Sequence, residues 1–414
     1  MNILFLHQNM PGQFKSLAPL MARDPDNRVV FLTTRQNAEL PGVGTAIYKK
    51  PRASNRGTHH YLVRFENAVR YGQQVARGLL GLKKRGFEPD LIIAHPGWGE
   101  ALFCKDIVPE AKLINLCEFY YGAKGRDIDF DPEFPTDLDA VCRTRARNAH
   151  LLSSLESCDA GVSPTEWQKS AHPEGLQDKI EVIFDGIDID KVKPDHDASF
   201  TLPDGRKLTR KDKVVTYAVR NLEPYRGFHS FMRAIPAIQR RQPDAEIVIV
   251  GGDEVSYGAK PEDESFANWR EAMEAQVVYD SAKVHFTGRL PYDRYLSVLQ
   301  ISSAHVYLTY PFVLSWSCLE AMACEALVIG SATPPVEEVI VDGENGLLTD
   351  FFNGDAIAEQ ITRVLDDPSA FADIRRAARQ TIVDRYALDR CLPRWLKLIE
   401  KVTNRPQAHM NAHL

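Results

Sequence analysis

Residues 306–330, VYLTYPFVLSWSCLEAMACEALVIG, decide the fold of this chain. The run VYLTYP is apolar, β-branched and aromatic and closes with a proline, and LVIG is a second such run that ends at a glycine. The segment CLEAMACEA between them consists mostly of strong helix formers. Strand, loop, helix and strand in this order predict a βαβ unit of a parallel sheet.

The loop of this unit, residues 311–317, leads into the N-terminus of the helix. Free backbone N–H groups at a helix N-terminus attract anions such as phosphate. One turn into the helix, the carboxylate of Glu320 can accept hydrogen bonds from two neighbouring hydroxyl groups, such as those of a ribose. The same residues also fit a buried βαβ unit in which Glu320 only caps its own helix. This stretch by itself leaves both interpretations open.

The sequence LEAMAC, followed by a hydrophobic strand and an acidic segment, resembles the donor site of the family-4 glycosyltransferases. The resemblance implies an α/β protein of the GT-B fold, with two Rossmann-like domains facing a central cleft and a C-terminal helix that crosses back. The family pattern contains two glutamates spaced eight residues apart. Glu320 matches the second, and the resemblance implies that it binds the nucleotide. Phe312 stands at the position of the first glutamate.

The glycine-rich loop of that family is also altered in this chain. In its place stand Ser315, Trp316 and Ser317, for which the resemblance implies contacts with the sugar or phosphate of the donor. Both departures lie at the sugar end of the expected donor site, whereas the nucleotide end keeps the family pattern.

The composition is that of a soluble globular protein, with 44% hydrophobic and 26% charged residues. A length of 414 residues predicts two or three domains. The net charge of −6 does not indicate nucleic-acid binding. The seven cysteines show neither CxxC pairs nor metal-site spacing, which is typical of a reduced cytoplasmic protein. We recognise no signal peptide or membrane-spanning run and expect at most peripheral contact with a membrane.

The chain begins with a strand, the loop HQNMPGQF and a helix, which is the opening of a Rossmann-like domain. In that loop Gly12 permits close backbone approach, and Gln13 can donate to a phosphate or a sugar. A later strand, LIIA, ends at His95, where open α/β sheets bind ligands. A plain turn and a structural histidine remain the alternatives. The resemblance implies that Gly12 and Gln13 contact the donor diphosphate or the acceptor, and that His95 faces the donor sugar.

Residues 59–85 form a helical pattern that is rich in arginine and lysine. One interpretation is a solvated helix face, and the other is contact with an anionic membrane or a lipid-pyrophosphate acceptor. The polar loop 122–135 is a candidate acceptor loop, because the resemblance places the acceptor in the N-terminal domain.

The second half of the chain opens with a strand that ends near Arg220 and a helix that begins near Arg226. The resemblance matches these two residues to the cations that neutralise a diphosphate leaving group. A surface location of both cations is the alternative. Residues 195–213 are polar and without periodicity, and they are predicted to be a linker.

Three more residues complete the expected donor site. Gly251 and Gly252 follow the strand EIVIV and are expected to let the nucleotide approach the backbone. Arg289 follows the strand VHFTG and is expected near the base. Residues 253–283 form an acidic insert to which the sequence assigns no role.

We therefore expect residues 1–195 to be an acceptor domain, 196–385 a donor domain, and 386–414 a helix that packs back on the first. The expected activity is that of a retaining, metal-independent hexosyltransferase without cofactors. It would use a UDP- or GDP-sugar and a glycan or lipid-linked acceptor in envelope or exopolysaccharide synthesis. One alternative is an inactive GT-B scaffold or partner protein, which Phe312 favours. The other is a sugar-nucleotide epimerase, for which no good pair of carboxylates is evident.

Overall fold

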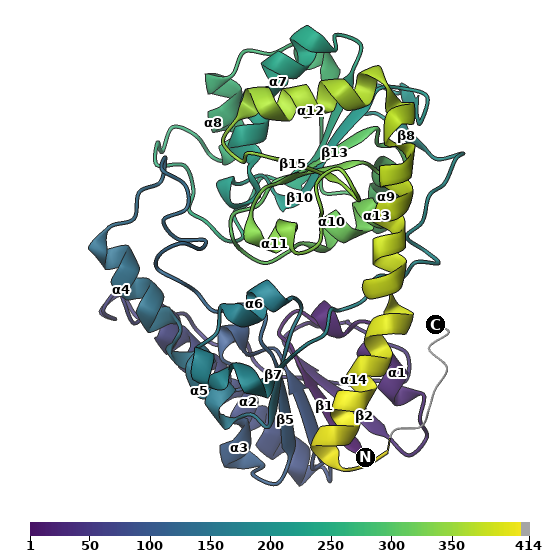
Figure 1. Ribbon diagram of the computed structural model, residues 1–414. Coiled ribbons are helices and arrows are strands. Elements are labelled where there is room, and N and C mark those ends of the chain that lie inside the picture. Colours follow the sequence, from purple (N-terminus) through teal and green to yellow (C-terminus); the bar gives the residue numbers. More distant parts are fainter. Residues whose placement is uncertain (407–414) are drawn as a thin grey trace. The chain divides into compact units, whose positions relative to one another are not determined.

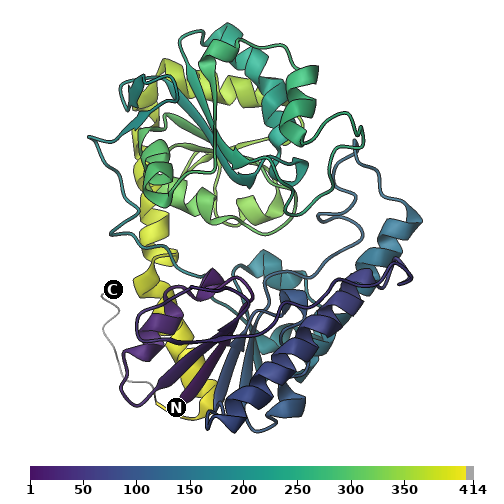
Figure 2. The ribbon, with the colours of Figure 1, turned by 180° about the vertical axis from the view of Figure 1, so that it is seen from behind.

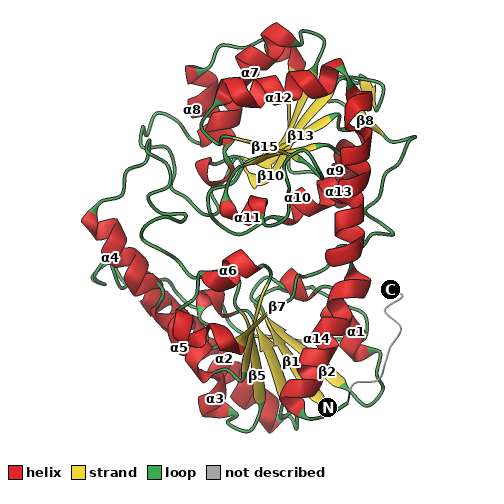
Figure 3. Cartoon of the chain, viewed as in Figure 1, coloured by secondary structure: helices red, strands yellow, loops and turns green. Residues whose placement is uncertain are grey.

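The computed structural model describes residues 1–406, and the chain divides into two compact units. The first unit consists of residues 1–186 together with the segment that begins at Leu388, and the second is Ile187–Ala387. Each unit is built on a parallel β-sheet with helices on both faces (Figure 3). The prediction of an α/β protein with two Rossmann-like domains is confirmed.

The first unit has a seven-stranded sheet in the order β3-β2-β1-β4-β5-β6-β7, in which all neighbouring strands are parallel. Strands such as β4, with the sequence LIIA, are fully buried, which explains why they are continuous apolar runs and not alternating patterns. The strands are β1 (Asn2–Leu6), β2 (Arg28–Thr33), β3 (Gly44–Ile47), β4 (Leu91–Ala94), β5 (Lys112–Leu116), β6 (Ala160–Ser163) and β7 (Ile180–Val182).

Helices cover both faces of this sheet. On one face Leu4 and Leu6 share a hydrophobic core with Leu79 of α2, and on the other Phe5 packs against Phe14 with 5.4 Å between the ring centroids. Figure 1 shows α1 and α14 in front of the sheet, and Figure 2, from behind, shows the long helix α2. The α-helices are α1 (Leu17–Ala22), α2 (Val63–Lys84), α3 (Cys104–Ile107), α4 (Leu138–Arg147), α5 (Ala149–Ser157), α6 (Glu166–Ser170) and α14 (Leu388–Thr403). The 3₁₀ helices are η1 (Gly12–Phe14), η2 (Pro96–Trp98) and η3 (Glu174–Lys179).

Helix α14 belongs to the first unit although it comes last in the chain. Its apolar residues at helical spacing are buried, and they include Trp395 and Leu398. Lys401 Nζ lies 2.7 Å from Oε1 of Glu181, a residue of β7, and this ion pair ties the outer face of the helix to the sheet.

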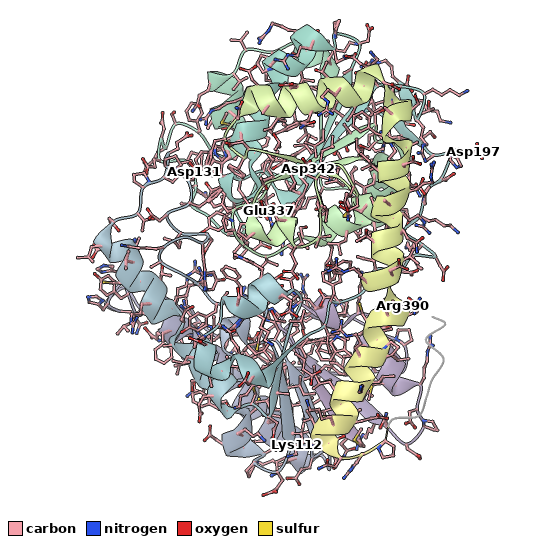
Figure 4. The ribbon with its side chains drawn as sticks, viewed as in Figure 1. Lys112, Asp131, Asp197, Glu337, Asp342 and Arg390 are labelled. Atoms are coloured by element: carbon pink, nitrogen blue, oxygen red, sulfur yellow. The ribbon has the colours of Figure 1, made fainter. Side chains whose placement is uncertain are left out.

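The strand order of the first sheet reverses between β1 and β4, because the chain runs from β1 outward to β3 and then from β4 toward β7. Open α/β sheets bind their ligands at the carboxyl ends of the strands at such a point. His7, His95 and Glu118 follow β1, β4 and β5 and therefore lie at this edge. Lys112, labelled in Figure 4, marks the opposite edge at the amino end of β5.

The second unit has a six-stranded parallel sheet in the order β12-β11-β10-β13-β14-β15. Its strands are β10 (Val214–Asn221), β11 (Glu246–Gly252), β12 (Val284–Gly288), β13 (Ala304–Tyr307), β14 (Val328–Ser331) and β15 (Leu347–Thr349). Its α-helices are α7 (Phe228–Arg241), α8 (Trp269–Gln276), α9 (Tyr292–Ile301), α10 (Trp316–Ala323), α11 (Pro334–Glu337), α12 (Gly354–Asp366) and α13 (Ala372–Arg385). The 3₁₀ helices are η4 (Pro224–Arg226), η5 (Ser281–Lys283) and η6 (Pro368–Phe371).

The βαβ unit predicted for residues 306–330 is confirmed as β13, α10 and β14. The two strands are parallel, with Val306 opposite Ile329. The strand order of this sheet reverses between β10 and β13, so the loop that leads from β13 into α10 lies at the switch point.

The prediction of a linker at residues 195–213 is wrong, because this segment contains an antiparallel hairpin. Its strands are β8 (Ser199–Thr201) and β9 (Lys207–Thr209). Ala198, Phe200 and Leu202 alternate with polar residues and are buried. An apolar pattern with a period of two residues indicates a half-buried strand. Here the pattern spans only five residues within a highly charged segment, so it is a weak signal in the sequence.

Within residues 1–406, no helix combines the length and the apolar character that a transmembrane span requires.

Candidate active site

Five side chains gather at the carboxyl edge of the first sheet, and we call them the polar cluster: His7, Gln13, His95, Trp98 and Glu118. The sequence predicts Gln13 and His95 as site residues but not the other three. Both His7 and Glu118 follow apolar strands at their carboxyl ends, and this position is the signal that could have identified them.

A row of hydrogen bonds leads to Glu118 from one side. The backbone N–H of Asn9 donates to His7 Nδ1 at 2.9 Å, so a neutral His7 carries its proton on Nε2. His7 Nε2 donates to Gln13 Oε1 at 3.0 Å. The side-chain amide of Gln13 then donates to Glu118 Oε1 at 2.7 Å.

A second row leads to Glu118 from the other side. The backbone N–H of Gly97 donates to His95 Nδ1 at 3.1 Å, and His95 Nε2 donates to Glu118 Oε2 at 3.2 Å. Both rows begin at backbone N–H groups, which can only donate, so every hydrogen bond points toward Glu118. The side chain of Glu118, where the two rows meet, must therefore accept hydrogen bonds at both oxygens, as an ionised carboxylate does.

The pKa shifts agree with an ionised Glu118. Burial raises the pKa of this carboxyl group, but the hydrogen bond and the charge of His95 outweigh burial and lower it below the ordinary value. Burial lowers the pKa of His95, whereas the hydrogen bond and the charge of Glu118 raise it, and the net shift is upward. Glu118 and His95 therefore stabilise each other's charged forms.

Three rings of the polar cluster pack together. The ring centroids of His7 and His95 are 4.9 Å apart, and Trp98 lies 5.3 Å and 4.8 Å from them. Burial and the neighbouring His95 lower the pKa of His7 to about 3, so His7 is neutral at neutral pH. Trp98 is 36% exposed. An exposed indole in the same cluster as a carboxylate offers the apolar face and the hydrogen-bond acceptors that a sugar ring needs.

Gly12 supports this cluster directly. Its φ is +52°, and a Cβ atom there would lie 2.5 Å from Nε2 of His7. A residue with a side chain would displace the imidazole, so the glycine is required by packing against His7. The contact of Gly12 and Gln13 with a diphosphate or an acceptor stays a prediction.

In the second unit, Glu320 lies one turn into α10 and is 5% exposed. Its Oε1 accepts from the Tyr292 hydroxyl at 2.7 Å, and its Oε2 accepts from the Tyr295 hydroxyl at 2.8 Å. Each carboxylate oxygen has a second lone pair, so the two tyrosines fix the orientation and leave acceptor positions for further hydroxyl groups. Both tyrosines lie on α9, and the sequence pattern does not single them out.

Ser315, Trp316 and Ser317 lie at the start of α10. Ser315 Oγ accepts from the Ser317 backbone N–H at 3.3 Å and caps the helix. The interpretation of Glu320 as the cap of its own helix is therefore wrong. The Ser315 backbone N–H donates to the Tyr307 hydroxyl at 2.8 Å, which positions the loop. Contacts of these three residues with a donor stay a prediction.

The two predicted cations have different environments. Arg220, near the end of β10, is exposed and has no hydrogen-bond or ion-pair partner in the described part of the chain. Arg226 is 5% exposed, and its Nη1 donates to Thr309 Oγ1 at 2.9 Å and to the Val313 carbonyl at 2.8 Å. Arg220 can thus receive an anion from solvent, whereas Nη1 of Arg226 holds the loop before α10.

Aromatic rings surround the guanidinium of Arg226. Its Cζ lies 5.3 Å from the ring centroid of Tyr257 and 5.7 Å from that of Phe312. The two rings are 4.8 Å apart. Phe312 is buried, so an aromatic contact occupies the position where the resemblance places a glutamate.

The first part of the acidic insert folds onto Glu223, which is fully buried. The carboxylate of Glu223 accepts backbone N–H bonds from Ser256, Tyr257 and Gly258 at 3.0–3.2 Å. Three successive N–H groups around a carboxylate form a nest, an arrangement that binds anions. Glu223 therefore fixes the segment that carries Tyr257.

The two predicted glycines at the end of β11 lie against side chains of the same unit that leave no room for a Cβ atom. A Cβ atom at Gly252 would lie 2.7 Å from Arg289 Nε, and one at Gly251 would lie 2.8 Å from the side chain of Leu222. Arg289 Nη2 donates to Asn221 Oδ1 at 2.7 Å and pairs with Glu254 at 2.6 Å. Nucleotide contacts of the glycines and a base contact of Arg289 stay predictions.

The two parallel sheets place chemically distinct groups at their carboxyl edges: a polar cluster in the first unit, and a fixed carboxylate with an exposed arginine in the second. This architecture defines the GT-B class. The family model described as "Glycosyl transferase family 4 group" matches residues 25–192, and the model "Glycosyl transferases group 1" matches residues 204–381. The chain belongs to the family-4 glycosyltransferases.

Curated relatives match at low identity. An uncharacterized glycosyltransferase of Methanocaldococcus jannaschii is 21% identical over 54% of this chain and 53% of its own length. A GDP-mannose-dependent phosphatidylinositol monomannoside mannosyltransferase of Mycolicibacterium smegmatis is 27% identical over 55% of this chain and 57% of its own length. The match thus spans little more than half of these two relatives. A D-inositol 3-phosphate glycosyltransferase of Corynebacterium aurimucosum is 25% identical over 82% of both chains.

Solved structures confirm the GT-B fold. Anabaena HepE, in complex with UDP and glucose, matches with a TM-score of 0.66 and 16% identity over 97% of this chain and 100% of its own. Sucrose-phosphate synthase from Thermosynechococcus elongatus matches with a TM-score of 0.73 and 16% identity over 98% and 99% of the two chains.

Proposed function

We propose that this protein transfers a sugar from a nucleoside-diphosphate sugar, with UDP or GDP as the leaving group, to a glycan or lipid-linked acceptor. The observation that carries the proposal is the carboxylate of Glu320, which Tyr292 and Tyr295 hold in one orientation beside the switch point of the second sheet. Its remaining acceptor positions suit the two hydroxyls of a ribose. The relative named for GDP-mannose and the HepE complex with UDP support a nucleotide donor.

In this proposal the diphosphate is neutralised by side chains, without a metal ion or another cofactor. Arg220 is the cation that a diphosphate can reach, because it is exposed and unpaired in residues 1–406. A guanidinium binds two phosphate oxygens at once and stabilises the charge that develops when the glycosidic bond breaks. Arg226 supports the loop at the same end of the sheet through Val313.

We further propose that transfer retains the anomeric configuration. Phe312 is buried at the position that a family carboxylate would occupy, so we assign the acceptor's proton to the leaving diphosphate. The diphosphate oxygen would take the proton of the acceptor hydroxyl on the face from which it departs. The acceptor sugar is assigned to the polar cluster of the first unit, where Trp98 is exposed beside His95, the partner of Glu118.

Phe312 also favours a second candidate function. A GT-B protein that lacks the carboxylate could bind a nucleotide sugar without transferring it and act as a partner subunit. The two functions share a nucleotide site and differ in turnover.

The test is to incubate the protein with UDP-glucose, UDP-galactose and GDP-mannose, alone and with saccharide acceptors, and to measure released UDP or GDP. We expect release from one donor, its loss in Arg220→Gln, and no change in Lys211→Gln, an exposed control on the same unit. Proton NMR of the product reports the anomer. Binding without release would establish the inactive partner, and absence of binding to every donor would contradict both functions.

A further inference from the structure

A pair of arginines lies near the polar cluster of the first unit. Arg64 is in the first turn of α2, and Arg147 is the last residue of α4. The guanidinium of Arg147 lies over the ring of Tyr121, with Cζ 3.5 Å from the ring centroid. Asn148 fixes the backbone of Tyr121, because its side chain donates to the Tyr121 carbonyl at 2.7 Å and accepts from the Tyr121 N–H at 3.1 Å. Arg147 therefore rests on a rigid support.

Neither guanidinium is neutralised within the protein. In residues 1–406, no carboxylate pairs with Arg64 or Arg147, whereas the neighbouring cations Arg70 and Arg143 pair with Glu66 and Asp137. Helix α2, which carries Arg64, packs against α4 and α5. Partial burial and then the charge of Arg147 lower the pKa of Arg64, so the two cations repel each other. An anion placed between them would relieve this repulsion.

The pair is connected to the polar cluster through α5. His150 is three residues after Arg147 and donates from Nε2 to the Gly97 carbonyl at 3.1 Å. Gly97 lies between His95 and Trp98 of the polar cluster. Residues three apart lie on the same side of a helical segment, so Arg147 is close to the loop that carries Trp98.

We propose that Arg64 and Arg147 bind a phosphate group of the acceptor, while the polar cluster beside them binds its sugar hydroxyls. The inference rests on the proposed transferase function, since it specifies that acceptor as a phosphorylated saccharide or polyol. Arginine suits this task because its planar guanidinium donates two parallel hydrogen bonds to phosphate, and because stacking on a tyrosine holds its plane fixed. The phosphate can belong to a soluble sugar phosphate or to a lipid headgroup.

The test is isothermal titration of the full chain with glucose 1-phosphate and with glucose. We expect the phosphate to bind, and we expect the double variant Arg64→Gln, Arg147→Gln to bind it at least about tenfold more weakly. The matched control is Arg77→Gln, which removes an exposed cation from the same helix and should leave the affinity unchanged.

Two further measurements separate the possible outcomes. Arg220→Gln tests whether the phosphate binds in the second unit instead. If Arg220→Gln loses glucose 1-phosphate binding and the double variant keeps it, the proposal is overturned. Equal losses in the double variant and Arg77→Gln would overturn it as well, because they indicate a general charge effect. UDP affinity, measured in parallel, should be the same in wild type and double variant. If neither the wild type nor the double variant binds UDP, the proposed function is refuted but the phosphate site is not.

Sedimentation with phosphatidylcholine vesicles, with and without phosphatidylinositol, identifies the source of the phosphate. If the wild type binds the phosphatidylinositol vesicles and the double variant does not, the phosphate belongs to a lipid headgroup. Binding of glucose 1-phosphate alone assigns a soluble sugar phosphate. A double variant that retains wild-type binding to both probes contradicts the site.

Discussion

The imidazole of His95 and the carboxylate of Glu118 lie 3.2 Å apart, Nε2 to Oε2, at the ends of two adjacent strands. Because the Gly97 N–H holds the other ring nitrogen of His95, the neutral ring can only donate toward Glu118. The Gly97 N–H therefore fixes the tautomer of the neutral His95 ring, and Glu118 fixes the direction of the hydrogen bonds in the polar cluster.

Glu118→Gln should disrupt this cluster. A glutamine cannot accept from both His95 and Gln13, because one end of its amide is a donor. The unmatched donors should cost about 1–3 kcal/mol of the free energy of unfolding, and the pKa of His95 should fall, because the hydrogen bond and the charge of Glu118 raise it. Urea denaturation and ¹⁵N NMR of the histidine rings measure these two effects. Glu110→Gln, at an exposed position, is the control, and an unchanged pKa of His95 in Glu118→Gln would contradict the account.

Arg220 and Arg226 should respond differently to the same substitution. Arg220→Gln should change the free energy of unfolding by less than about 0.5 kcal/mol, because the side chain is exposed and unpaired in the described residues. Arg226→Gln should cost about 2 kcal/mol or more, since it removes buried hydrogen bonds to Thr309 and Val313. Urea titrations of both variants are the measurement. Equal stability losses would show that the two environments are not distinct.

His305 should make the second unit sensitive to acid. It is fully buried in β13, and burial lowers its pKa to about 3, compared with about 6.5 in the unfolded chain. Its contribution to stability is fully present above pH 6.5 and is lost as the pH falls toward 3, because only the unfolded chain takes up the proton. Between pH 7 and pH 5 this loss is about 2 kcal/mol.

The variant His305→Asn isolates this effect. Asparagine does not titrate, and its amide can replace Nδ1 in the hydrogen bond to Thr216 Oγ1, which is 2.8 Å long. All other groups titrate equally in both proteins. Wild type should lose about 2 kcal/mol more than the variant between pH 7 and pH 5 in urea denaturation. Parallel losses would mean that His305 does not have the lowered pKa.

Glu223 should control the mobility of the segment at residues 256–258. Glu223→Gln removes the negative charge that these three backbone N–H groups surround, and charge-assisted hydrogen bonds are roughly twice as strong as neutral ones. Hydrogen–deuterium exchange of these amides should become faster, whereas Glu262→Gln, exposed in the same insert, should leave it unchanged. Unchanged exchange in Glu223→Gln would contradict the role of the carboxylate.

The fold was predictable because it depends on patterns that are local in the sequence. The apolar runs around Val306 and Ile329 flank a strong helix former, and the structure forms that βαβ unit. The hairpin at residues 199–209 was missed because its alternation is short and surrounded by charged residues.

The candidate site was predictable only in part, because many of its contacts join distant segments. Glu320 was identifiable from its motif, but its partners Tyr292 and Tyr295 come from another helix. Glu223 and the insert segment near Tyr257 are 34 residues apart, and no spacing in the sequence relates them. Arg220 is exposed and Arg226 is buried, and this difference depends on packing that only the folded chain defines.

The central claim is that Glu320 binds the ribose of a nucleoside diphosphate, and isothermal titration with UDP and GDP tests it most directly. One nucleotide should bind to wild type, and Glu320→Gln should weaken it about tenfold or more, because an amide accepts on one side only. Glu359→Gln, exposed on α12, should bind as wild type does. Equal affinity of wild type and Glu320→Gln, or no binding of either nucleotide to the folded protein, would contradict the claim.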